Sequence, residues 1–285
     1  MKGSQSNLQT RIYQKETSIN PGILLKEIFR DIYQSRFLAR QLAERDIKAQ
    51  YRQSYLGIIW AFITPIATAA IWIFLNLSGT IRVTDTGIPY PVYAFTGTVL
   101  WSIVTEAINS PTASTFSARG IMNKINFSKE ALIISGIYKL LFNSSIKILL
   151  LLLFVFLFGI GFHWSLLLLP FVILGALLFG TTIGLFLTPI SMLYKDVGRV
   201  VAMGLNFLMY VTPVVYAMPS EGILRTLMLI NPISPIILTS RDLITGASPD
   251  FLTYYFVVLV ATLPFFLLGL MFYRVSIPII VERSA

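Results

Sequence analysis

The sequence predicts an all-α integral membrane protein: six transmembrane helices, an N-terminal amphipathic interface helix, and a re-entrant helical hairpin between spans five and six. Three observations lead to this fold class. Hydrophobic residues make up 55% of the 285 residues and charged residues only 12%, about half the usual soluble share. The mean hydropathy is +0.75, and long charge-free stretches alternate with basic segments. This composition excludes a soluble enzyme or a free nucleic-acid-binding module, because polar groups could not cover the apolar surface in water.

The first 54 residues divide into two segments. Residues 1–21 form a polar tail without the short apolar core of a signal peptide, so we expect nothing to be cleaved. Residues 22–54 place Ile28, Ile32 and Leu42 at near-helical spacing among basic residues, which predicts an amphipathic helix in the cytoplasmic membrane interface.

The rest of the chain is predicted to be one six-span domain over 55–275, followed by a cytoplasmic tail over 276–285. A span needs about 20 apolar residues. One stretch, 148–194, is too long for one crossing, and its glycine-containing turn at 159–164 divides it. The predicted spans are 53–81, 86–105, 137–159, 165–190, 200–220 and 251–273.

Lysine and arginine orient these spans. The segments that would share one side of the membrane carry eighteen of them and the alternate loops three, with Lys147 left inside a span. Both termini are therefore predicted to be cytoplasmic. The connection over 217–250 is too long for a turn and too apolar for a free loop, so two short helices that dip back into the membrane are expected.

Residue types that carry chemistry are scarce. Cysteine is absent, and the single histidine, His163, lies beside Trp164 in a short turn, where an interfacial anchor is the favoured interpretation. No phosphate-binding loop, metal-binding His/carboxylate motif or serine nucleophile motif is present. The sequence predicts no catalytic residue, no metal site and no cofactor in this chain, and a transport protein driven by a separate energy source.

Four motifs occur in order along the chain. Residues 45–65 read RDIKAQYRQSYLGIIWAFITP, 193–199 read LYKDVGR, 212–216 read TPVVY and 231–242 read NPISPIILTSRD. Together they resemble permeases of type-2 ABC transporters that export lipid-linked polysaccharides such as O-antigen and teichoic acid. The resemblance covers about residues 24–275. It implies a homodimer around one channel, with two copies of an ABC ATPase that binds ATP and Mg on the cytoplasmic face.

Two charged cytoplasmic segments are candidates for contact with that ATPase; the alternative is that they are solvated loops. The residues concerned are Lys124, Lys129 and Glu130 in the 119–130 linker, and Tyr194, Lys195 and Asp196 in the 193–199 turn.

A channel for a hydrated glycan needs aromatic rings for the sugar faces and polar groups for the hydroxyls. The first span offers residues four apart, and the fifth offers a second set. They are Trp60, Thr64, Thr68, Trp72 and Asn76, then Asn206, Tyr210 and Tyr216. The alternative is that the rings are interfacial belt residues and the threonines bond to their own helix.

Three basic residues, Arg45, Lys48 and Arg52, fall on one face of the interface helix. They could bind lipid headgroups, the ATPase or the pyrophosphate of the carrier lipid.

Glu106 and Lys147 are the two charges expected inside spans. Counting about 22 Å and 18 Å down from the outer surface places them at similar depth, so an ion pair is predicted. The alternative is that Lys147 extends alone to the interface.

The function predicted from the sequence is the permease subunit of an ATP-driven exporter of polyprenyl-pyrophosphate-linked polysaccharide in the bacterial inner membrane. One alternative is a type-2 ABC permease for a small drug or lipid. The other is an integral-membrane transferase acting on polyprenyl-linked sugars, which would require an acidic or histidine cluster.

Overall fold

The computed structural model describes residues 21–52, 55–80, 86–122, 124–194 and 196–284 of the chain. Within these ranges the structure consists of helices and their connections, so the all-α class is confirmed. The helices are α1 (Pro21–Arg52), α2 (Trp60–Leu77), α3 (Tyr90–Ser117), α4 (Arg119–Met122), α5 (Glu130–Leu157), α6 (Leu169–Leu193), α7 (Asp196–Tyr210), α8 (Ile223–Ile230), α9 (Ile233–Thr245) and α10 (Leu252–Ser284), with short 3₁₀ turns at Gly57–Ile59 and Trp164–Leu168.

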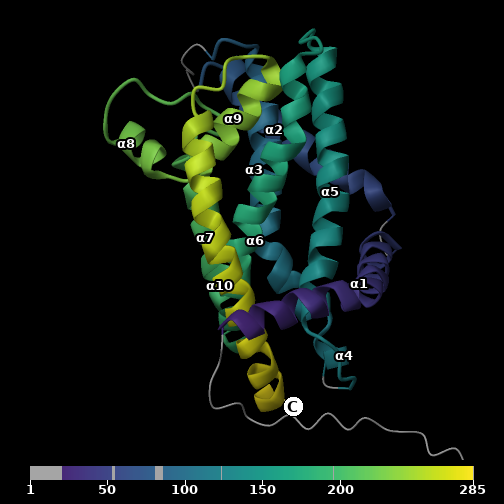
Figure 1. Cartoon of the computed structure of the whole chain (residues 1–285). Coiled ribbons are helices and arrows are strands. Elements are labelled where there is room, and N and C mark those ends of the chain that lie inside the picture. The colour runs from purple at the N-terminus through teal and green to yellow at the C-terminus, as the bar shows by residue number, and fades with distance from the viewer. Residues whose placement is uncertain (1–20, 53–54, 81–85, 123, 195, 285) are drawn as a thin grey trace, which may run out of the picture.

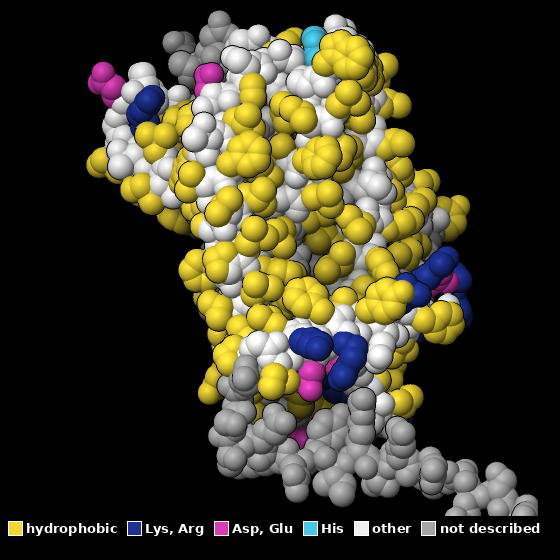
Figure 2. All heavy atoms as spheres, viewed as in Figure 1, with side chains coloured by type: hydrophobic (Ala, Val, Ile, Leu, Met, Phe, Trp, Pro, Cys, Tyr) yellow, Lys and Arg dark blue, Asp and Glu magenta, His cyan; other side chains and the backbone are white. Residues whose placement is uncertain are grey.

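The long helices run roughly side by side, and α1 lies across one end of the bundle (Figure 1). The short helix α4 and the C-terminal end of α10 lie at that same end, whereas α8 and α9 lie at the opposite end. Charged side chains on the face seen in Figure 2 gather at the α1 end and near α8, and the band between them is largely hydrophobic. This is the surface pattern of a protein that meets hydrocarbon in its middle and water at its ends.

Four described helical segments are long and apolar enough to cross a membrane: Gly57–Leu77, Glu130–Leu157, Trp164–Leu193 and Leu252–Glu282. These coincide with four of the six predicted spans. Ile223–Ile230 and Ile233–Thr245 pass the same test together and are bent by 86°. Such a bend is compatible with either a broken span or a re-entrant hairpin.

The other two predicted spans correspond to α3 and α7. α3 has sufficient length, at 28 residues, but a more polar composition. α7 has only 15 residues and gives way to a turn after Tyr210. Pro213 explains that end, because the residue before a proline is disfavoured in helical conformation.

The middle of the bundle is organised by close contact between α3 and α6. Gly180 and Gly184 lie one turn apart on α6, and both face α3. A Cβ atom added at Gly180 would lie 2.5 Å from the Cβ of Ala107, and one added at Gly184 would lie 2.3 Å from the carbonyl oxygen of Ile108. The two glycines therefore let the backbones approach, as small residues do in membrane helix pairs.

Two apolar clusters surround this contact. The larger joins α3, α5, α6 and α9, with Phe95, Ile103 and Ile237 fully buried. The smaller lies at the α1 end, where Ile28 of α1 and Tyr273 of α10 are both 0% exposed. α1 is therefore packed against the bundle and is not a free amphipathic arm.

Candidate functional site

The predicted channel residues of α2 are divided between surface and core. Trp60 is 51% exposed, whereas Trp72 packs against the larger apolar cluster. The Thr64 and Thr68 hydroxyls each donate a 3.0 Å hydrogen bond to the carbonyl four residues earlier. Both threonines thus use their proton within the helix, as the belt alternative expects, and only their oxygen lone pairs remain for a ligand. Asn76 is half-buried at the far end of the row.

α7 supplies the second predicted row, and none of its residues is buried. Asn206 is exposed and Tyr210 is 54% exposed, while Tyr216 lies half-buried in the following turn. The Tyr210 ring meets the Trp72 ring edge to face, with centroids 6.4 Å apart. The structure therefore brings the two predicted rows together at this aromatic pair.

The basic residues of α1 behave differently from one another. Arg45 donates to Asp46 from Nε (2.9 Å) and Nη2 (2.7 Å), whereas Lys48 and Arg52 are exposed. Asp46 also accepts hydrogen bonds from Lys139 Nζ of α5 and from Ser117 Oγ of α3, both at 2.8 Å. Burial alone would raise the pKa of Asp46, but these donors and the Lys139 charge outweigh it and lower that pKa. Asp46 therefore ties α1 to both α3 and α5.

A second ionic cluster ties the start of α1 to α5 and α10. Arg274 of α10 lies 3.2 Å from Glu27, 2.9 Å from Asp31 and 2.5 Å from Glu130. Glu130, which was predicted to contact the ATPase, is only 3% exposed and also accepts a hydrogen bond from Ser128. Its carboxylate is thus engaged within the chain.

The remaining predicted coupling residues are more accessible. Lys124 is exposed, and the Lys129 ammonium lies 4.4 Å from the centre of the Phe127 ring. Burial lowers the pKa of Lys129, with the Glu130 charge opposing it. Tyr194 is 65% exposed, and Asp196 forms an exposed 3.4 Å pair with Arg199. Lys195 lies outside the described residues.

Glu106 and Lys147 are in direct contact. Lys147 Nζ lies 2.6 Å from Glu106 Oε2, and the side chains are 15% (Lys147) and 27% (Glu106) exposed. Asn143, one turn before Lys147 on α5, donates to the other carboxylate oxygen. Burial and the nearby Glu106 charge raise the pKa of Tyr51 on α1. The pair joins α3 to α5 close to the C-terminal end of α1.

Sequence reasoning missed three polar contacts. The links from Asp46 to Lys139 and from Arg274 to Glu130 join residues far apart in the chain, and no local pattern marks them. Arg241 is one of the three basic residues that the charge count placed in the alternate loops, yet it is 3% exposed. Its position within an apolar helical run, 233–245, was the available signal that it is buried.

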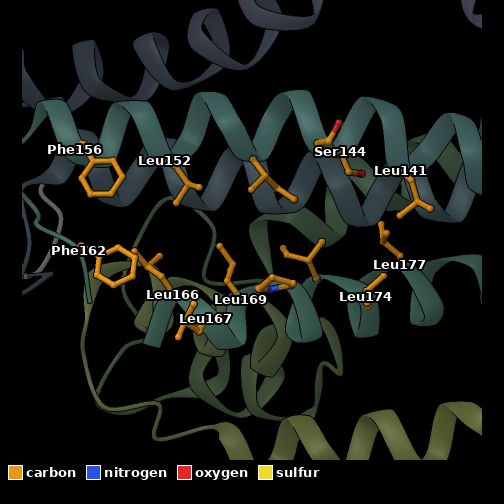
Figure 3. Close-up of a pocket in the computed structure, with 14 residues that line it drawn as sticks. Leu141, Ser144, Leu152, Phe156, Phe162, Leu166, Leu167, Leu169, Leu174 and Leu177 are labelled. Carbon is orange, nitrogen blue, oxygen red and sulfur yellow. The ribbon is translucent and has the colours of Figure 1, made fainter. Parts of the chain in front are cut away.

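A cavity of about 500 Å³ lies between α5 and α6, and neither Trp72 nor Tyr210 is among the described residues that line it. Figure 3 shows Leu152 and Phe156 of α5 facing Phe162 and Leu166 across it. Its lining is apolar except for two serines, and it contains no charged side chain. Among the described residues, no group of three or more His, Cys, Asp or Glu side chains could hold a metal ion.

The fold and these contacts define a membrane protein of several apolar helices, tied together by polar clusters near their ends. Residues 38–245, more than half of the chain, match the ABC-2 type transporter family. The chain belongs to this family.

The chain is also similar to proteins named O-antigen export system permease protein RfbA. The Myxococcus xanthus protein is 27% identical over 209 residues, which cover 72% of this chain and 79% of that protein. Two Klebsiella pneumoniae proteins of the same name are 21% and 22% identical, covering 74% and 71% of this chain and 81% and 78% of their own lengths.

Proposed function

We propose that this protein is the permease subunit of an ATP-driven exporter that moves polyprenyl-pyrophosphate-linked polysaccharide, of the O-antigen kind, across the bacterial inner membrane. The observation that carries the proposal is the likeness to three O-antigen export permeases over most of each chain. The permease makes and breaks no bond in its cargo. ATP and Mg bind to a separate ABC ATPase, of which two copies join two copies of the permease.

In this proposal the six spans are α2, α3, α5, α6, α7 with its following turn, and α10. The bent pair of α8 and α9 is a re-entrant hairpin on the outer side, and α1, which covers most of the predicted 22–54 segment, lies in the cytoplasmic interface. The polar tail (1–21), the six-span domain (55–275) and the final segment (276–285) keep their predicted roles, with both termini cytoplasmic. The common position of α1, α4 and the end of α10 at one end of the bundle supports this topology.

The second copy would cover the unburied side of α7. Val200, Met203, Phe207 and Tyr210 recur at helical spacing and are each more than half exposed. A stripe of this kind on a 15-residue helix gains little from its own bundle. In the proposed homodimer it faces the partner subunit and the channel between the two copies.

The channel would be lined by Trp60, Thr64, Thr68, Trp72 and Asn76, together with Asn206, Tyr210 and Tyr216. The contact between Trp72 and Tyr210 supports a continuous aromatic surface, on which the C–H faces of sugar rings can stack.

The exposed Lys48 and Arg52 of α1 would meet lipid headgroups or the carrier pyrophosphate, with Arg45 beside them.

The ATPase would dock on the linker carrying Lys124 and Lys129 and on the exposed turn from Tyr194 through Lys195 to Asp196. Glu130 would act there through Arg274, because its carboxylate is already bound within the chain. Movement of the linker would then reach α1 and α10 directly.

The test is export in cells that express the permease with its ATPase but lack their own exporter. Surface glycan per permease molecule is measured for Trp72→Ala and Tyr210→Ala, with Trp164→Ala as the control. Trp164 is 81% exposed in the turn after α5 and belongs to neither row. Losing a stacking contact predicts about a fivefold or larger drop for the first two variants and none for the control. Equal export from all three, or ATP hydrolysis by the purified permease alone, would contradict the proposal.

A further inference from the structure

The chain leaves α7 through a non-helical turn, residues 211–216, which we name the carbonyl turn. The Thr212 oxygen accepts a hydrogen bond from the Val214 amide within the turn, at 2.7 Å, and the other carbonyls of the turn need partners from elsewhere. Side chains of α3, of α9 and of the α8–α9 connection supply those groups. Asn231 Nδ2 donates to the Val211 oxygen at 3.2 Å, and Tyr93 Oη donates to the Tyr216 oxygen at 3.2 Å.

Arg241 of α9 makes the two central contacts. Its Nη1 donates to the Pro213 oxygen at 2.9 Å, and its Nη2 donates to the Val214 oxygen at 2.5 Å. The guanidinium carbon lies 3.7 Å from the centre of the Tyr93 ring, and Nε reaches the Thr96 hydroxyl at 3.4 Å. One planar fork therefore bridges two successive carbonyls while stacking on an aromatic face.

This arrangement has a high desolvation cost. Arg241 is 3% exposed, and the described residues give it no ion pair with a carboxylate. Burying a charge is unfavourable unless nearby dipoles compensate, and an apolar side chain would fill the same space with less desolvation. What the guanidinium provides is positioning of the backbone. Two of its nitrogens donate to the turn while its face stacks on Tyr93 of α3.

Gly97 of α3 completes the contact. A Cβ atom added there would lie 1.8 Å from the Val214 oxygen and 2.3 Å from Arg241 Nη2. α3 thus approaches the carbonyl turn so closely that only glycine fits. Arg241 and Gly97 hold the same backbone from two sides.

We propose that Arg241 is a positioning residue of the exporter: it fixes the carbonyl turn on α3, and thereby sets where Tyr210 and Tyr216 stand at the outer end of the path. The transport part of this inference rests on the proposed function. The positional part does not, since it concerns contacts within this chain.

Because the chain has no cysteine, a single introduced thiol reports the position of the turn. Val215 is 1% exposed, and Val104, also 1% exposed, lies on α3 away from the turn. Maleimide labelling of Val215→Cys and Val104→Cys is compared in permease–ATPase complexes carrying Arg241, Arg241→Lys or Arg241→Met. Lysine keeps the charge but cannot bridge both carbonyls.

The proposal expects labelling of Val215→Cys to accelerate about tenfold or more with Arg241→Met, because losing charge-assisted hydrogen bonds shifts local opening by that order. Arg241→Lys should give a smaller increase, and Val104→Cys should stay protected in both backgrounds. Unchanged labelling at Val215→Cys overturns the proposal. Equal exposure of both thiols also overturns it, because Arg241 would then support the whole fold.

A second readout concerns coupling. Arg241→Met should lower glycan export per ATP hydrolysed, while the ATPase activity of the complex is kept. A proportional loss of both activities would overturn the positioning role, since a general folding defect lowers them together. The labelling needs no substrate, so an absence of export in the wild-type complex would count against the proposed function and leave the positional result intact.

Discussion

Removing one partner of the Glu106–Lys147 pair should cost more than removing both. Lys147→Met leaves the Glu106 carboxylate with Asn143 as its remaining side-chain donor, in a position where only 27% of the side chain is exposed. Adding Glu106→Gln removes the stranded charge and keeps a group that can bond to Asn143. The double variant should therefore be more stable than Lys147→Met alone.

The structure sets the expected magnitude. At 2.6 Å and an effective dielectric constant of about 20, the Coulomb attraction is about 6 kcal/mol, and desolvation of both groups cancels most of it. Exposed pairs contribute at most about 1 kcal/mol, and breaking fully buried pairs costs about 3–5 kcal/mol. For this partly exposed pair we expect a loss of about 2 kcal/mol for Lys147→Met and about 1 kcal/mol for the double variant.

Thermal unfolding of the purified permease measures the difference. The expected fall in Tm is about 5 °C for Lys147→Met and about 2 °C for the double variant. Lys48→Met is the matched control, because Lys48 is exposed on α1 and its removal should leave the Tm nearly unchanged. If the double variant is as unstable as Lys147→Met, or less stable, the reasoning about a stranded charge is wrong.

Three further predictions follow from the contacts described above. Asp46→Asn should destabilise the protein by about 1–3 kcal/mol at pH 7. Because the pKa of Asp46 is lowered in the folded state, the difference in unfolding free energy from wild type should shrink as the pH falls from about 4 through that lower pKa. Equal differences at pH 7 and pH 3 would contradict this. Gly184→Ala should separate α3 from α6 and reduce the yield of folded protein in size-exclusion chromatography, whereas Gly204→Ala, with nothing within 4 Å of the added Cβ, should not; equal yields would refute the packing argument. Asp196→Asn should lower the ATPase activity of the assembled complex at unchanged Tm, and unaltered activity would remove the exposed turn from the docking surface.

Hydropathy and charge predicted the apolar part of the fold because the backbone N–H and C=O groups of each uncharged stretch must be paired within a helix. This worked for α2, α5, α6 and α10, where composition alone is decisive. It was less informative for α3, whose polar residues face neighbouring helices, and for the stretch after Val200, where Pro213 ends α7 early. Periodicity records how apolar a face is, but not which neighbour covers it.

The polar contacts divide in the same way. Counting residues from the predicted outer surface placed Glu106 and Lys147 at one depth because they lie on consecutive predicted spans, α3 and α5, with a known rise per residue. No such count applies to Asp46, which meets residues 71 and 93 positions away. The contacts of Arg241 depend on how closely α3 passes the carbonyl turn. Gly97 permits that close approach, but the sequence alone does not show that Gly97 and the turn are neighbours.

The distribution of contacts suggests which parts of the permease can move. At the α1 end, Asp46 and Arg274 join α1 to α3, α5 and α10 through ion pairs and charged hydrogen bonds. At the opposite end Arg241 joins α9 to α3 and the carbonyl turn, and between them the glycines of α6 hold α3. α7 has no buried residue, and it packs against the larger apolar cluster along one side only, through Val201, Leu205, Leu208 and Met209. The other side of α7, with Met203 and Phe207, is exposed, so this helix can shift at lower cost than its buried neighbours. In the proposed homodimer, opening of the channel should therefore appear first as a displacement of α7 against Trp72.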